Sequence, residues 1–360
     1  MPKERINEID LLRFLAVMAV VLFHYAFRGY AAGGMTILPY PLAPIAKYGF
    51  FGVHLFFLIS GFVILMTASS GSLRRFFVSR FSRLYPAFWV CCTITFIVTI
   101  LIGAPRYTVS IRQYLANMTM MSGFIGIGSI DGVYWSLFIE LRFYAFIAAI
   151  LLIGKIKKAQ LFLTIWLIAC ITIDVLQIGK LRSFLIVDYA GFFIAGATFF
   201  SIWSKGLSRS RVATLVGSFG LAMYETLMEM PHFEQHFNTQ IDSFIVAVII
   251  TALFLVMLSI SLRRTGSFGN RQWILAGGIT YPLYLLHQNI GFMIFNIAYP
   301  TIDKHLLLWG TILLAIGAAA TIHIFVEQRF SLQLKHSLDN AIDYSHRSML
   351  RLSHQIRQRR

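Results

Sequence analysis

Charged residues, and acidic residues above all, are scarce in this chain. Its 360 residues include 15 Asp and Glu against 31 Lys and Arg, only 13% are charged, and 58% are hydrophobic. Soluble globular domains carry about 25% charged residues, and a disordered chain needs a low hydrophobic content. The composition therefore excludes both classes. It predicts an all-α, polytopic bundle of transmembrane helices.

Cysteine is scarcer still, and this limits the chemistry that the chain can carry. Cys91, Cys92 and Cys170 all lie in apolar runs and have neither the spacing of metal ligands nor the even count of a disulfide framework. We expect buried, unreactive thiols and no metal. The net charge of +16 would suit a nucleic-acid-binding protein, but a membrane protein places excess Lys and Arg beside anionic lipid. We therefore expect membrane lipid as a partner and no nucleic acid.

Long apolar runs are what the chain has in abundance. A bilayer-crossing helix needs about 20 mostly apolar residues, and about ten segments come close to this length. They are 9–29, 48–68, 85–103, 133–153, 159–178, 184–203, 211–225, 242–262, 273–298 and 305–326. The segment 107–127, with Gly123, Gly126 and the adjoining Gly128, is predicted to be a loop of re-entrant or interfacial character.

The distribution of Lys and Arg predicts the orientation of these spans. Positive residues crowd the N-terminus, alternate loops such as the one around residues 74–83, and the tail, and such loops are cytoplasmic. Both termini are therefore predicted to be cytoplasmic. The loop 226–241, which has no Lys or Arg, is predicted to lie outside.

The same pattern divides the chain into residues 1–330, a transmembrane domain, and 331–360, a basic cytoplasmic tail. In the tail, apolar residues recur at helical spacing. It either forms an amphipathic helix on the inner leaflet or is a partly ordered, solvated tail. The apolar positions are Leu338, Ile342, Met349, Leu352 and Ile356.

Several ionisable residues interrupt the predicted spans. A charge at the bilayer centre costs at least about 2.5–3.5 kcal/mol, so each of them is a functional candidate. A membrane histidine can also serve only in helix–helix hydrogen bonding, an alternative that applies to His54 and His323. The full set is Arg13, His24, His54, Glu140, Arg142, Asp188, His287 and His323.

Three of these residues are predicted to meet at one depth. Arg13 and His24 project from one helical face, because eleven residues turn a helix only about 20° beyond three full turns. Counting residues from the predicted span ends places His24, Glu140 and His287 at a similar depth on three different helices. We expect a polar site where these helices converge.

Five motifs, in the right order, resemble those of the acyltransferase-3 family of integral membrane acyltransferases. The first is the pair Arg13 and His24 with ten residues between them. His54 departs from the family, which commonly has Asp at this position, and Thr280 replaces the usual Ser. The resemblance is to the stand-alone transmembrane core, without an appended extracytoplasmic domain. The motifs are LLRFLAVMAVVLFHY, FFGVHLFFLISGFVI, RFSRLYPAFW, VYWSLFIELRFY and ITYPLYLLHQ.

The resemblance implies transfer of an acyl group, usually acetyl, from cytoplasmic acetyl-CoA to a carbohydrate hydroxyl at the outer face of the bacterial inner membrane. In that reaction His24 is the general base. Glu140 or His287 orients its ring, and Arg13, on the same helical face, also serves this base. Whether His24 carries the acetyl group covalently is left open. Donor binding is assigned to Arg80, Arg83 and Arg13, which suit the phosphates of CoA, and to Ser60 and Gly61.

Two other functions are compatible with buried histidines and carboxylates. A proton-coupled transporter also uses such groups, but its internal repeats or paired broken helices are not evident in the sequence. A non-catalytic accessory protein of a polysaccharide pathway is the second alternative. The acceptor could be an exopolysaccharide, O-antigen, glucan or lipid-linked oligosaccharide, and no motif predicts which; the oligomeric state is equally unpredicted.

Overall fold

The computed structural model describes residues 6–37, 39–266, 269 and 271–358, with side chains as far as Tyr344. Lys3, Arg5, Arg359 and Arg360, which belong to the predicted cytoplasmic charge, lie outside these residues. All regular structure in the described part is helical, so the predicted all-α class is confirmed. The longer helices are α1 (Asn7–Phe23), α4 (Gly52–Ala68), α5 (Leu73–Ile102), α7 (Trp135–Leu152), α8 (Ala159–Val175), α10 (Val187–Lys205), α11 (Arg209–Phe237), α12 (Ser243–Ser261), α14 (Ile274–Ala298), α15 (Lys304–Ile322) and α16 (Gln328–Gln358).

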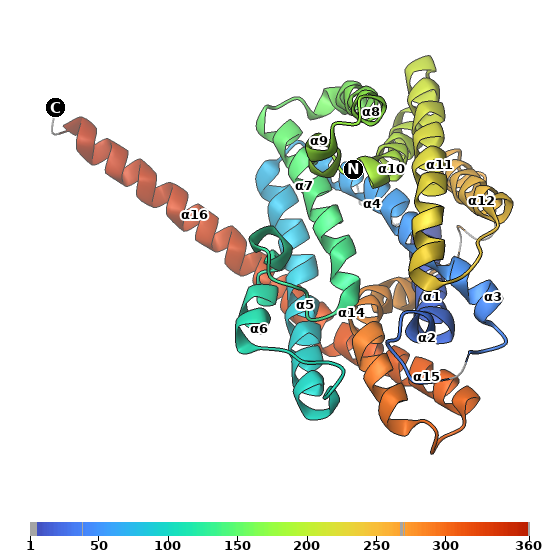
Figure 1. Ribbon diagram of the computed structural model, residues 1–360. Helices are drawn as coiled ribbons and strands as arrows, with labels where there is room; N and C mark the ends of the chain where they lie inside the picture. Colours follow the sequence, from blue (N-terminus) through green and yellow to red (C-terminus); the bar gives the residue numbers. More distant parts are fainter. Residues whose placement is uncertain (1–5, 38, 267–268, 270, 359–360) are drawn as a thin grey trace.

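Short helices connect the long ones or extend their ends. Two of them are π-helical turns that continue α1 and α15. Most of the others lie in the segments that connect the long helices (Figure 1). They are η1 (His24–Arg28), α2 (Gly29–Ala31), α3 (Ala43–Ala46), η2 (Lys47–Phe51), α6 (Ile111–Met118), η3 (Ser122–Ile125), η4 (Gly132–Tyr134), η5 (Ile156–Lys158), α9 (Gly179–Phe184) and η6 (His323–Glu327).

Eight of the described helices are long and apolar enough to cross a membrane, and the protein is a multi-pass membrane protein. Eight of the ten predicted spans coincide with these helices. Helices form in the remaining two segments, as α11 and α14, but neither is among the eight. In α14 the polar residues His287, Gln288 and Asn289 lower the hydropathy, because this helix carries part of the candidate site.

Three predicted loops contain helix. Helix α11 continues to Phe237, so most of the predicted outside loop 226–241 is helical. Helix α5 begins at Leu73 with the Ser72 hydroxyl accepting from the backbone N–H of Arg75, and the four arginines predicted in a cytoplasmic loop lie on this helix. The segment 107–127 holds α6 and η3. Apolar runs mark where a helix crosses a bilayer, but the backbone hydrogen bonds of the helix continue beyond it.

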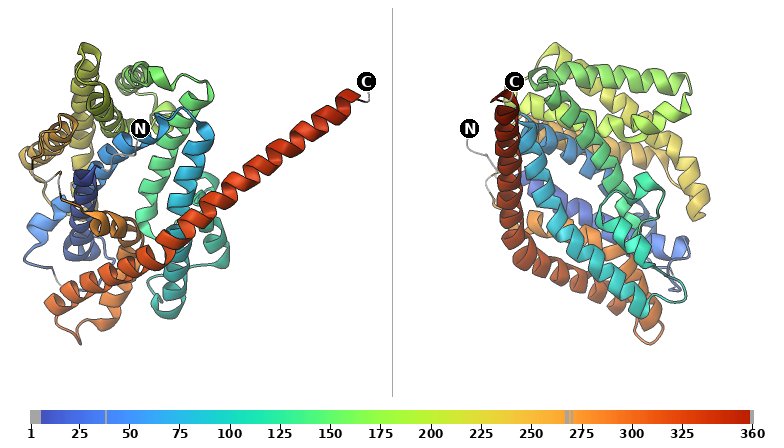
Figure 2. Two further views of the ribbon diagram at one scale, coloured as in Figure 1. Left: turned by 180° about the vertical axis from the view of Figure 1, so that it is seen from behind. Right: turned by 90° about the vertical axis from the view of Figure 1, so that its left-hand side faces the viewer.

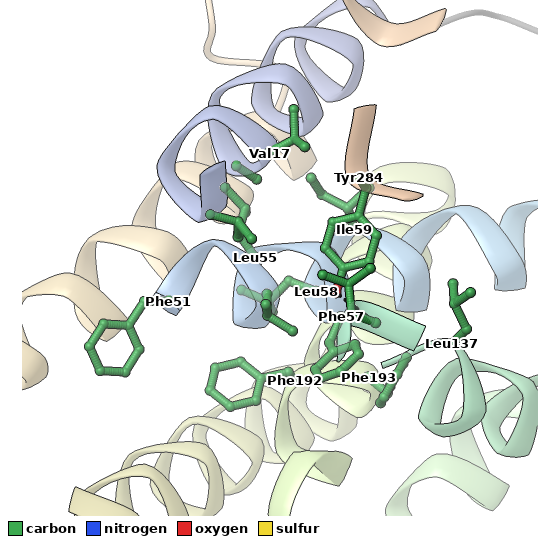
Figure 3. Packing of buried hydrophobic residues seen from close by; sticks show 14 of the residues in the cluster. Val17, Phe51, Leu55, Phe57, Leu58, Ile59, Leu137, Phe192, Phe193 and Tyr284 are labelled. Carbon is green, nitrogen blue, oxygen red and sulfur yellow. Dashed lines mark hydrogen bonds between the residues drawn. The ribbon is translucent and has the colours of Figure 1, made fainter. Parts of the chain in front are cut away.

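The centre of the bundle is the crossing of α4 and α10. Helix α10 lies against both α4 and α11, and α4 also packs on α1. Figure 3 shows Leu55, Leu58 and Ile59 of α4 between Val17 of α1 and the aromatic rings of α10. The two helices approach closely because Gly61 and Gly196 face each other's backbone; a Cβ on Gly196 would lie 2.0 Å from the Leu58 carbonyl oxygen.

Replacing Gly196 by alanine is therefore expected to destabilise the fold. The added methyl group meets backbone atoms that cannot rotate away, so α4 and α10 must separate, and overpacking of this kind costs about 1–3 kcal/mol. The measurement is the thermal unfolding midpoint of the purified protein in detergent. Gly310→Ala in α15 is the matched control, since a Cβ there meets nothing within 4 Å. An equal midpoint for both variants would contradict the close crossing.

The tail predicted from residue 331 is part of helix α16. Arg74 of α5 forms ion pairs with Asp339 and Asp343 of α16. Beyond this contact the helix extends away from the other helices (Figures 1 and 2). The division into a transmembrane domain and a cytoplasmic tail stays a prediction.

Candidate active site

His24 lies at the point where α1 changes its winding. Residues 7–23 form a regular α-helix, and His24 begins the π-helical turn η1, in which the N–H of Gly29 donates to the His24 carbonyl oxygen. Single π-helical turns are rare in proteins, and those that occur frequently lie at functional sites. The His24 side chain is buried, with 7% of its surface exposed.

His24 is hydrogen-bonded to His287 of α14, which is fully buried. The distance between His24 Nδ1 and His287 Nε2 is 3.1 Å. The predicted approach of these two residues is therefore confirmed. We call them the histidine pair.

The hydrogen bonds around the histidine pair determine its tautomers. His287 Nδ1 faces the carbonyl oxygen of Tyr284 at 2.9 Å, and a carbonyl oxygen only accepts, so Nδ1 carries the hydrogen. His24 Nδ1 faces the Val20 carbonyl oxygen at 2.8 Å and must carry a hydrogen for the same reason. It donates to Val20 and to the lone pair of His287 Nε2. In the neutral pair, the basic lone pair of His24 is therefore on Nε2.

Glu140 lies in a different cluster from His24. Its Oε1 accepts hydrogen bonds from Ser60 Oγ at 2.5 Å and from Tyr144 Oη at 2.6 Å. Of the two residues proposed from the sequence to orient His24, the structure places His287 in contact with it. Glu140 instead belongs to the wall of a cavity.

This cavity, which we call the arginine cavity, lies between α1, α4, α5, α7 and α14 and has a volume of about 110 Å³. That is room for several water molecules, since one needs about 10–15 Å³. Arg13, Arg80, Arg83, Ser60 and Glu140 all line it, so five predicted residues come together. The rest of the lining consists of Val53, Phe56, Phe57, Ile59, Val63, Ile64, Leu84, Ser136, Leu137, Tyr144, Gly277, Thr280, Tyr281 and Tyr284.

Three predicted site residues are not among the described residues that line the cavity. Gly61 packs against α10 and has a packing role. His287 lies next to Tyr284, whose ring lines the cavity and has its centroid 5.8 Å from that of His287, and His24 is hydrogen-bonded to His287. The Tyr284 hydroxyl is 2.7 Å from Ser136 Oγ. Tyr284 thus adjoins both the arginine cavity and the histidine pair.

The remaining intramembrane candidates lie elsewhere. His54 is surrounded by the rings of Phe50, Phe51, Tyr189 and Phe192. Asp188 forms an ion pair with Arg182, Arg142 donates to the carbonyl oxygen of Ser183, and His323 pairs with Glu327.

Sequence reasoning missed several residues at the site. Tyr144, Ser136 and Tyr284 lie within the quoted motifs, but membership of a motif does not by itself predict a role for them. Asp131 lies just before η4, outside the predicted spans, and its carboxylate is fully buried. Burial raises the pKa of Asp131 to about 6, against the smaller lowering effects of hydrogen bonds from Val133 and Asn289 and of the charge on Arg28.

The whole bundle from α1 to α15 corresponds to one known domain. The sequence profile of the acyltransferase domain family (acyltransferase 3) matches residues 6–326. The chain belongs to this family. The five motifs quoted from the sequence all lie within the matched residues, so the resemblance to acyltransferase-3 proteins is confirmed.

Relatives within the acyltransferase-3 family include proteins with named functions. The chain is 32% identical to Nodulation protein 10 of Rhizobium leguminosarum bv. viciae over 38% of its own length and 42% of that protein. It is 29% identical to peptidoglycan O-acetyltransferase OatA of Listeria monocytogenes serovar 1/2a over 45% and 27%. It is 26% identical to a putative acetyltransferase, ORF330, of Acidianus two-tailed virus over 44% of each chain. The matches span less than half the length of each relative, and no solved structure matches the chain.

Proposed function

We propose that this acyltransferase-3 protein lies in the bacterial inner membrane and transfers an acyl group, specifically acetyl, from cytoplasmic acyl-CoA to a hydroxyl of a cell-surface or lipid-linked carbohydrate. The observation that carries the proposal is the arginine cavity, which Tyr284 lines and whose Tyr284 wall adjoins a histidine pair with one basic lone pair. The name of the relative OatA, a peptidoglycan O-acetyltransferase, supports acetyl as the group and a carbohydrate as the acceptor.

The donor end of the site is positive. Arg13, Arg80 and Arg83 line the cavity with Glu140 as the facing carboxylate. Within the described residues, the buried Nε of Arg80 has no hydrogen-bond partner, which leaves a donor for an incoming anion. Phosphate groups of CoA are such anions, and arginine binds them with paired hydrogen bonds. The positive-inside rule, with both termini cytoplasmic, supports a cytoplasmic opening for this end.

The base end of the site derives from the histidine pair. His24 Nε2 takes the proton of the acceptor hydroxyl as its oxygen attacks the thioester carbonyl carbon, and the carbon–sulfur bond breaks. The proton then passes to the CoA thiolate, which leaves as the thiol. His287 holds the His24 ring through the Nδ1–H bond, the role of the orienting group in a nucleophile–base–orienter arrangement.

The test is acyl transfer in sealed membrane vesicles of both orientations. We expect vesicles with the cytoplasmic face outward to transfer the radioactive acetyl group of labelled acetyl-CoA to carbohydrate, either chloroform-soluble and lipid-linked or polymeric. Right-side-out vesicles should transfer the label only after permeabilisation. Vesicles without the protein are the control. Transfer that needs no access to the cytoplasmic face would overturn the proposed orientation. Absence of any transfer, with the acceptor membranes of the native host present, would overturn the proposed activity.

A further inference from the structure

The turn before η4 is attached to α14 beside the histidine pair. Asn289 of α14 donates from its backbone N–H to Asp131 Oδ2 at 3.1 Å and from its side-chain amide to the Ile130 carbonyl oxygen at 2.9 Å. The other oxygen of Asp131 accepts from the N–H of Val133 at 3.1 Å. Asp131 therefore joins the start of α7 to the α14 segment that follows His287.

The same turn also positions Gln288. A Cβ on Gly132 would lie 2.1 Å from Gln288 Nε2, so the glycine backbone is in direct contact with the amide. Gln288 is buried, and its side chain is within hydrogen-bonding reach of His24. The turn 130–132 thus fixes two residues of α14 that adjoin the base.

The charge of Asp131 balances a nearby cation. Arg28 ends the π-helical turn that His24 begins, and its guanidinium acts electrostatically on His24, on His287 and on Asp131. A positive charge at this place disfavours a second one on the histidine pair, and a carboxylate offsets it.

We propose that Asp131 is a positioning residue of the acyl-transfer reaction: it holds the His287–Asn289 segment in place, and its negative charge offsets Arg28 so that His24 can accept a proton. The inference rests on the proposed function, because it assigns the residue a role in that reaction. The buried carboxylate of Asp131 belongs neither to the arginine cavity nor to the histidine pair, and the proposal assigns it a role in the reaction.

Because Asp131 can ionise, the proposal predicts the direction in which its effect on activity changes with pH. Its pKa is raised to about 6, so it is charged above that pH and neutral below it. Among the described groups that act on it electrostatically, Arg28 is charged at neutral pH. The others are Tyr25, Cys91, Cys92, Tyr107, Tyr134 and Tyr284.

The experiment is a double-mutant cycle measured at two pH values in permeabilised vesicles. Asp131→Asn is expected to lower kcat by about tenfold at about pH 8, with the KM for acetyl-CoA unchanged. At about pH 5 the wild-type carboxyl is itself neutral, so the ratio of the two rates should fall to within about threefold. In the background Arg28→Gln, the same substitution should cost less than about threefold at both pH values, because the uncompensated cation is gone.

A second variant separates position from charge. Gly132→Ala leaves both charges but displaces the Gln288 amide, and we expect a several-fold loss of kcat that is the same at both pH values. Monodisperse elution in detergent shows that each variant is folded. If Asp131→Asn does not fold, Gly132→Ala still tests the positional role. Equal cost of Asp131→Asn in both backgrounds would overturn the charge role, and an unchanged kcat in Gly132→Ala would overturn the positional one. Both results require a wild-type protein that is active. An inactive wild type would contradict the proposed function itself, not the role of Asp131.

Discussion

Replacing His24 by alanine is expected to lower acetyl transfer by about 10²–10⁴-fold, the contribution of a positioned general base, in a protein that still inserts and folds. The expected loss follows from the tautomers of the histidine pair, since His24 Nε2 is the one basic lone pair that the pair offers. The measurement is transfer from labelled acetyl-CoA in permeabilised membranes, with the protein level matched by immunoblot.

His54→Ala is the matched control for His24→Ala. His54 is also a buried histidine of the bundle, but aromatic rings surround it, and we expect its removal to cost less than about tenfold in activity. A His24→Ala protein that is present at the normal level and transfers acetyl within about threefold of the wild type would show that His24 is a packing residue, because such a ratio is less than half of a tenfold step of about 1.4 kcal/mol.

Replacing both Arg80 and Arg83 by glutamine is expected to raise the KM for acetyl-CoA by about 10- to 100-fold and to lower kcat much less. Each hydrogen bond to a charged group contributes about 1.5–3 kcal/mol, and these bonds act on phosphates that do not change during the reaction, so their loss affects binding. The KM for the carbohydrate acceptor should stay the same. Initial rates at varied acetyl-CoA and fixed acceptor give the two constants.

Arg75→Gln is the control for this double variant. Arg75 lies on the same helix and is exposed, and it is not among the described residues that line the arginine cavity. It should leave the KM for acetyl-CoA within about twofold of the wild-type value. A donor KM that does not change when Arg80 and Arg83 are replaced would reduce these two residues to anchors of membrane topology.

The sequence predicted the helical bundle well because hydropathy is a local signal. Every predicted span coincides with a helix, but the polar segments of α11 and α14 do not meet the hydropathy of a span, and counting apolar residues could not show where α5 and α11 end. The π-helical turn at His24 was not predictable, since one extra residue in a turn leaves no periodic pattern.

The sequence predicted the depth of the candidate site residues in the membrane, but not the directions in which their side chains point. Residue counting placed His24, Glu140 and His287 at one level, and the contact of His24 with His287 followed. Depth alone does not give the rotation of a helix about its axis, however, and α7 turns Glu140 toward Ser60 and Tyr144 rather than toward His24. Asp131 could not be found in this way because it precedes its span.

The position of Tyr284 beside both the arginine cavity and the histidine pair has a consequence for how two substrates would meet. Its ring lines the cavity, and its centroid is 5.8 Å from that of His287. If the proposed function holds, a donor bound in the cavity would contact this ring, whereas neither member of the histidine pair is among the described residues that line the cavity. We would then expect hydrolysis of acetyl-CoA to be slow until an acceptor hydroxyl reaches His24.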